Sequence, residues 1–162
     1  MEGIHVYATP WEMILQHLRH SIRAEQIFCS LTTEMKWLPT LANQPELAAV
    51  HKQNYETSYH MNTAAGNLLR LNRGWTWTDE DQTRLVVMTV ECLLEAYAHL
   101  KQAAAAMSRL IAADPQATRL LQAARHWHKQ RKYWLRQATH LLRKTVTPNV
   151  WEQGVHLVER AG

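Results

Sequence analysis

Residues that break helices are scarce in this 162-residue sequence, which contains five glycines and five prolines. Cysteine is scarcer still, at two residues, and no tract is low in complexity. This composition argues against collagen-like, repetitive and disordered chains. Cys29 and Cys92 lie among apolar residues without C-x-x-C spacing, so we expect both to be buried free thiols. The composition is that of a globular protein.

Long uncharged apolar runs are also missing. The most apolar segment, residues 85–111, contains Glu91, Glu95, Lys101 and Arg109, which argues against a membrane span. The first residues, MEGIHVYATPW, have no basic region followed by an apolar one, so they do not show the pattern of a secretory signal peptide. We therefore expect a cytoplasmic protein with no membrane association.

Helix-start signals, in contrast, precede each long segment that has a helical apolar period. They are Thr9-Pro10, Asn43-Gln44-Pro45, Thr78 before three acids, and Asp114-Pro115. Such signals supply an N-cap, a first-turn proline, or negative charge at the positive end of the helix dipole. We expect helices at 10–38, 45–73, 79–113 and 115–146, and a short one near 148–160. No alternating strand pattern competes with them.

The connections between these segments are only a few residues long, which makes consecutive helices antiparallel. With 46% apolar residues, a chain of this length can build one core, but it is short for two domains. The sequence therefore predicts a single all-α domain over residues 1–162. Its architecture is expected to be an up-down-up-down four-helix bundle with a short C-terminal fifth helix.

Negative charge is nearly absent from one region of the chain. Between Ala96 and Trp151 there are ten lysines and arginines and one acid, Asp114, a net charge of +9. The rest carries eight basic and thirteen acidic residues, a net charge of −5. Within AARHWHKQRKYWLRQATHLLRK, residues 123–144, there are seven basic residues and no acid. Like charges one turn apart destabilise an isolated helix by about 0.2–0.5 kcal/mol per pair, so we expect a group outside this helix to compensate them.

On a helical wheel this segment separates into two faces. The apolar arc expected to face the core consists of Leu120, Ala124, Trp127, Trp134, Ala138, Leu141 and Leu142. The opposite face carries Arg125, Lys129, Lys132, Arg136 and Arg143 within about 60° of arc. One border of that face carries Arg119, His126, Tyr133 and Lys144. We refer to these nine residues as the basic stripe.

The basic stripe predicts an anionic partner. Rows of lysine and arginine bind polyphosphate backbones by counterion release, and a neighbouring tyrosine offers a stacking surface for an unpaired base. Arginine outnumbers lysine twelve to six in the chain, which favours phosphate because the guanidinium group binds its oxygens bidentately. No helix-turn-helix, RRM or zinc-finger signature is present to read bases. We therefore expect sequence-tolerant contact with the backbone of a single strand or a heteroduplex.

The predicted function is that of a non-catalytic accessory subunit of a larger nucleoprotein complex, such as a small subunit of an RNA-guided effector, with other protein subunits as partners. Three alternatives stay open. The stripe is a solvated face or is paired with acids of neighbouring helices; it docks on an acidic protein; or the chain is a ferritin-like metal-binding bundle. A membrane-surface role would need Trp127 and Trp134 to face outward, whereas the wheel turns them toward the core.

Arg131 is an exception within the segment, because it projects near the centre of the apolar arc. An unpaired charge there is very costly. Glu25 is a similar anomaly on the first predicted helix, in line with Leu15, Leu18 and Ile22. Both residues lie near the middle of helices that would be neighbours. The sequence therefore predicts a buried, structural Glu25–Arg131 ion pair that fixes helix register.

No catalytic residue, metal site or cofactor is predicted. A di-iron bundle needs inward glutamates on two helices and Glu-x-x-His on two others, and none of the four long predicted helices contains Glu-x-x-His. Glu56 with His60, and Glu91 with Glu95, are expected on outer helix faces. The spacing of Arg136 and His140 occurs in helical ribonucleases, but it is common by chance.

The remaining histidine and tryptophan residues of interest receive structural interpretations. His17 and His20 share an outer face, whereas His126 and His128 point in different directions and cannot chelate one ion together. His51 is expected to be a hydrogen-bonded core histidine. Trp75 and Trp77, which follow Gly74 in an interhelical turn, are expected to close one end of the core.

Overall fold

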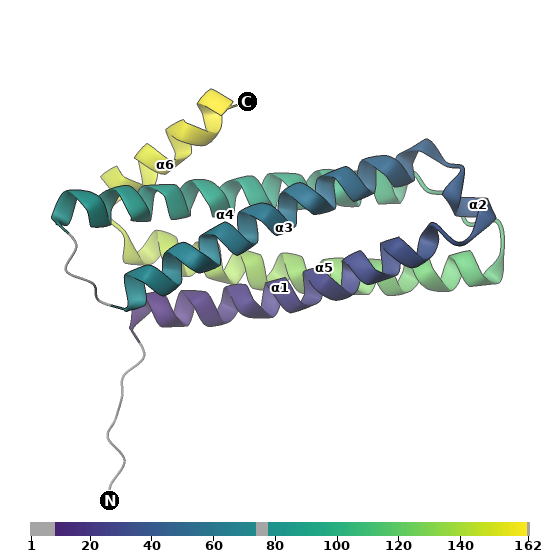
Figure 1. The fold of residues 1–162 in the computed structure, drawn as a ribbon, viewed down its shortest axis with the longest axis horizontal. Helices are drawn as coiled ribbons and strands as arrows, with labels where there is room; N and C mark the ends of the chain where they lie inside the picture. The colour runs from purple at the N-terminus through teal and green to yellow at the C-terminus, as the bar shows by residue number, and fades with distance from the viewer. Residues whose placement is uncertain (1–8, 74–77, 162) are drawn as a thin grey trace, which may run out of the picture.

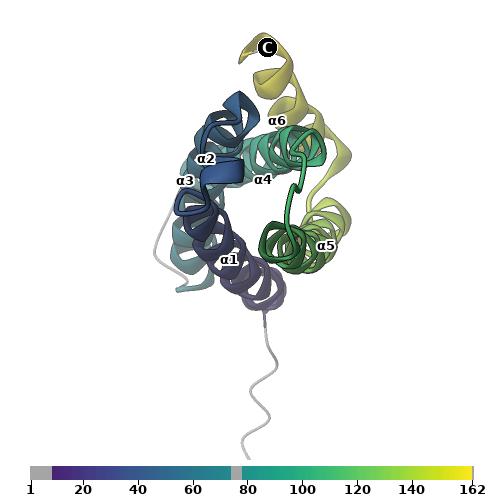
Figure 2. The ribbon, with the colours of Figure 1, turned by 90° about the vertical axis from the view of Figure 1, so that its right-hand side faces the viewer.

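The computed structural model describes residues 9–73 and 78–161, and over these ranges the chain contains helices and no strand. The six helices are α1 (Pro10–Met35), α2 (Pro39–Ala42), α3 (Pro45–Asn72), α4 (Asp79–Ser108), α5 (Pro115–Thr145) and α6 (Pro148–Ala161). The four long helices lie side by side in a bundle (Figure 1). Helix α6 lies outside these four helices and packs against α4, as the end-on view in Figure 2 shows. The predicted all-α helical bundle is confirmed.

The N-caps predicted at Thr9, Thr78 and Asp114 are confirmed. Each side-chain oxygen accepts a hydrogen bond from the backbone N–H three residues later, at 2.8–3.1 Å. Such a bond satisfies one of the four N–H groups that a helix start leaves without an intrahelical partner. Gln44 precedes α3 without a capping bond, so Pro45 at the first helical position defines that start. None of the helices in the described ranges is long and apolar enough to cross a lipid bilayer.

Two helices end earlier than the sequence predicted. The first long helix ends at Met35 rather than at residue 38, because Pro39 forces Leu38 into an extended conformation and a separate short helix begins there. Helix α4 ends at Ser108 rather than at residue 113. Beyond it, the Gln44 side chain donates to the Ile111 carbonyl at 2.8 Å and accepts from the Ile111 N–H at 2.9 Å. These two bonds replace the helical hydrogen bonds that this segment would otherwise need.

The core consists of two main apolar clusters along the bundle. One contains Leu18, Leu68, Leu93 and Leu135, and the other surrounds Phe28 near α2. Burying each of these side chains contributes about 1.5–3 kcal/mol. Helices α1 and α5 pack closely along each other, as do α3 and α4, whereas α5 makes only a few contacts with α4. The seam between α4 and α5 is therefore the more open one.

The buried face of α5 is turned toward the basic stripe relative to the sequence prediction. The buried residues are Ala117, Leu121, Ala124, Arg131, Leu135, Ala138 and Leu142. Leu120, Trp127, Trp134 and Leu141, which were expected in the core arc, are only partly buried. On a helical wheel this corresponds to a rotation of about 40°. As a consequence, the edge of the stripe lies at the α4 seam, and Lys132 there is partly buried.

Both cysteines are free thiols. Cys92 is buried as expected, whereas Cys29 is only partly buried, and its Sγ donates a hydrogen bond to Glu25 Oε1 at 3.2 Å. Burial, reinforced by nearby carboxylates, raises the pKa of Cys29 to about 12 and the pKa of Cys92 to about 11. Both thiols therefore stay protonated and unreactive at neutral pH.

Candidate nucleic-acid interface

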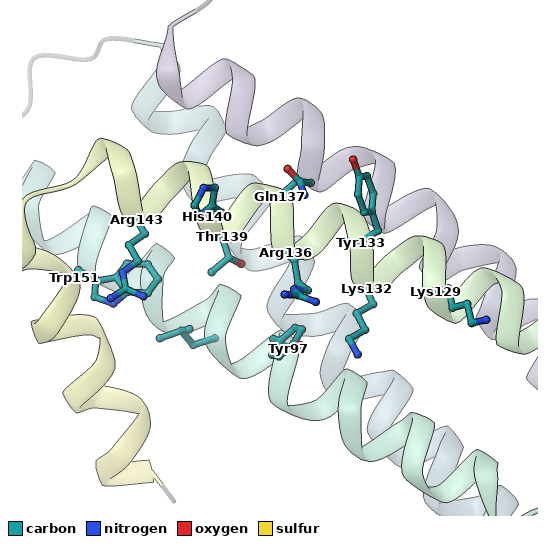
Figure 3. Close-up of a pocket in the computed structure, with 11 residues that line it drawn as sticks. Tyr97, Lys129, Lys132, Tyr133, Arg136, Gln137, Thr139, His140, Arg143 and Trp151 are labelled. Atoms are coloured by element: carbon teal, nitrogen blue, oxygen red, sulfur yellow. The ribbon is translucent and has the colours of Figure 1, made fainter.

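A groove of about 770 Å³ runs along α5 where it passes α4 and the start of α6. Its lining residues are Leu94, Tyr97, Lys129, Lys132, Tyr133, Arg136, Gln137, Thr139, His140, Arg143 and Trp151. Figure 3 shows Lys132 and Arg136 extending from α5 toward Tyr97 of α4, and Arg143 beside Trp151 of α6. Tyr133, Gln137 and His140 extend toward the other side of α5 in this view.

The groove is positively charged and contains no acid. Lys129, Lys132, Arg136 and Arg143 line it, together with His140. Within the described ranges, the ion pairs closer than 4.0 Å involve other cations, so none of these four has a carboxylate partner. The acids of the first three long helices therefore do not neutralise this part of the basic stripe. Considering residues 9–73 and 78–161, four cations without a carboxylate partner thus share one concave surface.

Aromatic rings lie among these cations. The Arg143 guanidinium lies 5.3 Å from the centre of the Trp151 ring, and Lys101 Nζ lies 5.2 Å from the centre of the Tyr97 ring, distances at which cation–π attraction operates. Trp151 is nearly buried against the core. A tyrosine face beside unpaired cations can stack on a base while the cations hold phosphates.

The open α4–α5 seam and the turn into α6 create this groove. Helix α5 ends where Val146 adopts an extended conformation, and α6 begins two residues later at Pro148. Helix α6 then packs on α4, and this packing brings Trp151 to the end of the groove. Gly154 makes the close packing possible, because a Cβ there would lie 2.4 Å from Val90 Cγ1.

The structure brings five of the nine basic-stripe residues into the groove: Lys129, Lys132, Tyr133, Arg136 and Arg143. Arg125, His126 and Lys144 are exposed on α5 but do not line the groove. Arg119 lies apart, in a recess of about 640 Å³ with Glu34 and the 80% exposed Trp37. The groove thus involves the C-terminal half of the predicted stripe.

Several groove residues have no counterpart in the sequence prediction. No binding role was predicted for Tyr97, Trp151, Thr139 or Gln137. Their signal in the sequence is weak, because they become neighbours only through the packing of three helices. His140 entered the prediction only through its spacing from Arg136.

Glu25 and Arg131 are in direct contact, as the sequence led us to expect. Arg131 Nη1 donates to Glu25 Oε2, and both side chains are buried. Arg131 Nη1 also lies 3.3 Å from Asn54 Oδ1, and the Arg131 guanidinium stacks on the Phe28 ring at 3.6 Å. Glu25 Oε1 accepts from Ser58 at 3.3 Å. Arg131 Nη2 has no hydrogen-bond partner in the described part of the chain.

This polar network links α1, α3 and α5 between the two apolar clusters. On α1 Glu25 follows Ile22 of one cluster and precedes Phe28 of the other, and on α5 Arg131 lies between Trp127 and Leu135 in the same way. The two buried charges of this layer meet each other in only one alignment of the helices. Sliding a helix by one turn would place a charge among leucines.

The histidines differ from the sequence prediction in both directions: His17 is partly buried rather than on an outer face, whereas His51 is more exposed than a core histidine. His17 and His20 stack on Trp134 of α5 at centroid distances of 5.6 and 4.6 Å, so they lie beside α5 rather than on a purely outer face. His51 is partly buried, but its Nε2 has no hydrogen-bond partner in the described ranges. His128 Nδ1 accepts from Arg131 Nε at 3.2 Å.

The expectation that Glu56, His60 and Glu95 lie on outer helix faces is wrong. All three are partly buried, and they face the seam between α3 and α4 together with His99. The reason is that α3 and α4 pack along each other over most of their length, so their polar flanks meet as well as their apolar faces. Trp75 and Trp77 lie outside the described residues, so the predicted closing role of this pair is not described by the structure.

Comparison of the chain with protein-family models, with curated proteins and with solved structures finds no match. A functional assignment therefore depends on the geometry and charge of the groove.

Proposed function

We propose that this protein is a non-catalytic nucleic-acid-backbone-binding protein that holds a single strand or a heteroduplex in the groove along α5. The observation that carries the proposal is the acid-free groove, in which Lys129, Lys132, Arg136 and Arg143 lack carboxylate partners among the described residues. Phosphate groups would supply the missing negative charge and release their condensed counterions.

The position of the cations fits a phosphate row. Lys129 and Arg143 are fourteen positions apart on one continuous helix, which corresponds to about 21 Å at 1.5 Å per residue. Two of the four cations are arginines, whose planar guanidinium groups bind phosphate oxygens bidentately. No base-reading element is part of the groove, so we expect binding that tolerates any sequence.

In this proposal the chain is a single domain with the up-down-up-down arrangement of α1, α3, α4 and α5 that the sequence predicts. A bundle with one exposed cationic groove suits an accessory subunit that clamps a strand inside a larger nucleoprotein assembly. Other protein subunits would then contact the remaining faces.

Two alternatives are less consistent with the structure. Neutralisation by the protein's own acids would require carboxylates near the groove cations, and none lies within 4.0 Å in the described ranges. Insertion into a membrane surface would use exposed tryptophans beside the stripe, but Trp127 and Trp134 are partly buried against neighbouring groups. Docking on an acidic protein is consistent with the same charges. The binding experiment described next distinguishes it from nucleic-acid binding.

The test is binding of fluorescently labelled single-stranded RNA, single-stranded DNA and duplex DNA, followed by anisotropy across a salt series. One variant replaces Lys129, Lys132, Arg136 and Arg143 with glutamine. A matched control replaces four exposed cations outside the groove, Lys36, Lys52, Arg70 and Arg73. Both variants lose the same charge, so they differ only in where it is lost.

We expect the logarithm of the association constant to fall linearly with the logarithm of the salt concentration, with a slope near −3 for four contacts on a single strand. The groove variant should lose this binding and the control should keep most of it. Equal loss in both variants would reject the groove as the binding surface. Absence of binding at low salt would reject the proposal and direct attention to an acidic protein partner.

A further inference from the structure

A second cluster of functional side chains lies on a neighbouring seam of the bundle, between α3 and α4. Each of these helices carries a glutamate and a histidine four positions apart, Glu56 with His60 on α3 and Glu95 with His99 on α4. Residues four apart lie on one helix face, and here the two faces meet. The His60 and His99 rings stack with their centres 5.5 Å apart and 6° between their planes.

The ligand atoms of this cluster converge. One donor atom from each of Glu56, His60 and His99 lies within 4.8 Å of the other two. Donors around a tetrahedral zinc ion are about 3.3–3.5 Å apart, given metal–ligand distances of about 2.0–2.2 Å.

A neighbouring amide sets the protonation of one ring. His99 Nδ1 lies 2.6 Å from Gln53 Oε1, and because an amide oxygen can only accept, Nδ1 carries the hydrogen. His99 Nε2, the other ring nitrogen, lies 3.6 Å from Glu95 Oε2. Metal-binding histidines typically use their second nitrogen in such a hydrogen bond, which orients the ring.

Both histidines of the cluster are reachable from solvent. The His60 and His99 side chains are 20% and 22% exposed, so an ion can enter from solvent without opening the core.

We propose that Glu56, His60 and His99 form a binding site for one divalent transition-metal ion, with Zn²⁺ as the best-matched ion. Two imidazole nitrogens and one carboxylate favour zinc over calcium or magnesium, which prefer oxygen ligands. Glu95 adds a second carboxylate that balances the charge of the ion. Gln53 positions His99. Three protein ligands leave a coordination position for water.

The test is titration of tag-free, chelator-treated protein with Zn²⁺ in competition with a chromophoric chelator. We expect one ion per chain. His60→Gln and His99→Gln should each weaken binding by at least about 100-fold, and Gln53→Leu by about 10–100-fold because it leaves the ligands in place. His156→Gln is the matched control, since His156 also lies beside a glutamate, Glu159, at 3.4 Å, but on exposed α6.

A second readout protects the test against variants that fail to fold. Far-UV circular dichroism reports helix content, and Glu56→Gln keeps the shape of its side chain while it removes the charge. Zn²⁺ should raise the midpoint of thermal unfolding of the wild type and of His156→Gln, but not of the cluster variants. Absence of stoichiometric binding, or binding that persists in both His60→Gln and His99→Gln, would overturn the assignment. The cluster would then be two helix-stabilising ion pairs.

Discussion

Arg131 is the most consequential single residue of the core. Its side chain is fully buried, and its charge is compensated by Glu25, Asn54 and the face of Phe28. A buried pair of this kind contributes little net stability compared with well-packed apolar residues, but loss of one partner leaves the other charge buried without compensation. The main role of the buried pair is therefore to align three helices.

Replacement of Arg131 by methionine should lower the free energy of unfolding by about 3–5 kcal/mol, because Glu25 would stay buried without its partner. The double variant Glu25→Leu with Arg131→Met should recover most of that loss. The measurement is urea denaturation of the wild type, each single variant and the double variant, which together give the coupling free energy between Glu25 and Arg131. Additive effects of the two single substitutions would contradict the buried pair.

His128 makes stability depend on pH. Burial, followed by the nearby charges of Arg131 and Lys132, lowers the pKa of His128 to about 4. Between about pH 6.5 and 4 the unfolded chain binds a proton at this residue and the folded chain does not. Stability should therefore fall as the pH falls through this range, by no more than about 2 kcal/mol because the ring is partly exposed to solvent.

The measurement is urea denaturation of wild type and His128→Asn at about pH 7 and about pH 4.5. Asparagine keeps an acceptor for Arg131 Nε but does not titrate. The variant should lose less stability between the two pH values than the wild type. Identical losses would show that other residues cause the acid sensitivity.

At the residue scale, the sequence predicted those features that the residue pattern of a single helix determines. Arg131 and Glu25 stood out because each broke an apolar arc on its own helix. Glu56 and His60 were misplaced because a wheel assigns every polar flank to solvent, whereas α3 and α4 pack so extensively that their flanks are covered. Tyr97 and Trp151 could not be assigned to the groove, because they line it together only through the packing of α6 on α4.

Among the elements, α6 depends on one glycine for its position. A Cβ on Gly154 would lie 2.4 Å from Val90 Cγ1, 2.6 Å from Val90 Cβ and 3.2 Å from the Val87 carbonyl oxygen. Valine is stiff at its first side-chain torsion and cannot turn away freely. The structure can accept a larger residue there only if α6 moves away from α4.

Gly154→Ala should therefore destabilise the protein by about 1–3 kcal/mol, although alanine is the better helix former. Gly66→Ala is the matched control, since a Cβ at that helical position meets no atom within 4 Å and should stabilise by up to about 1 kcal/mol. Thermal unfolding of both variants gives the comparison. Equal behaviour of the two substitutions would show that α6 is not held against α4 at Gly154.

Helix starts were predicted better than helix ends. Thr9, Thr78 and Asp114 supply local capping signals that act within three residues of sequence. The end of α4 depends instead on Gln44, which is far away in the sequence and reaches across to Ile111. A local pattern contains no information about such a partner, so the helix was extended by five residues.

For the whole molecule, the separation of charge along the chain becomes a separation in space. The region between Ala96 and Trp151 has a net charge of +9, and the rest of the chain has a net charge of −5. Folding places the groove cations on α5 and the Glu56, Glu91 and Glu95 carboxylates around the α3–α4 seam. The cationic groove and the carboxylate–histidine cluster, on which the two proposals rest, are therefore separate surfaces.

Under the proposed function, the length of the groove predicts how much nucleic acid it would hold. The four groove cations from Lys129 to Arg143 extend along about 21 Å of helix, and a stacked strand places one phosphate about every 3.4 Å. About six phosphates therefore fit beside them. Affinity for oligonucleotides should rise steeply up to about six nucleotides and slowly thereafter, measured by anisotropy at one low salt concentration. The glutamine variant of the four groove cations should lose the steep phase. Affinity that stops rising at two nucleotides, or rises just as steeply beyond twelve, would be inconsistent with a strand lying along α5.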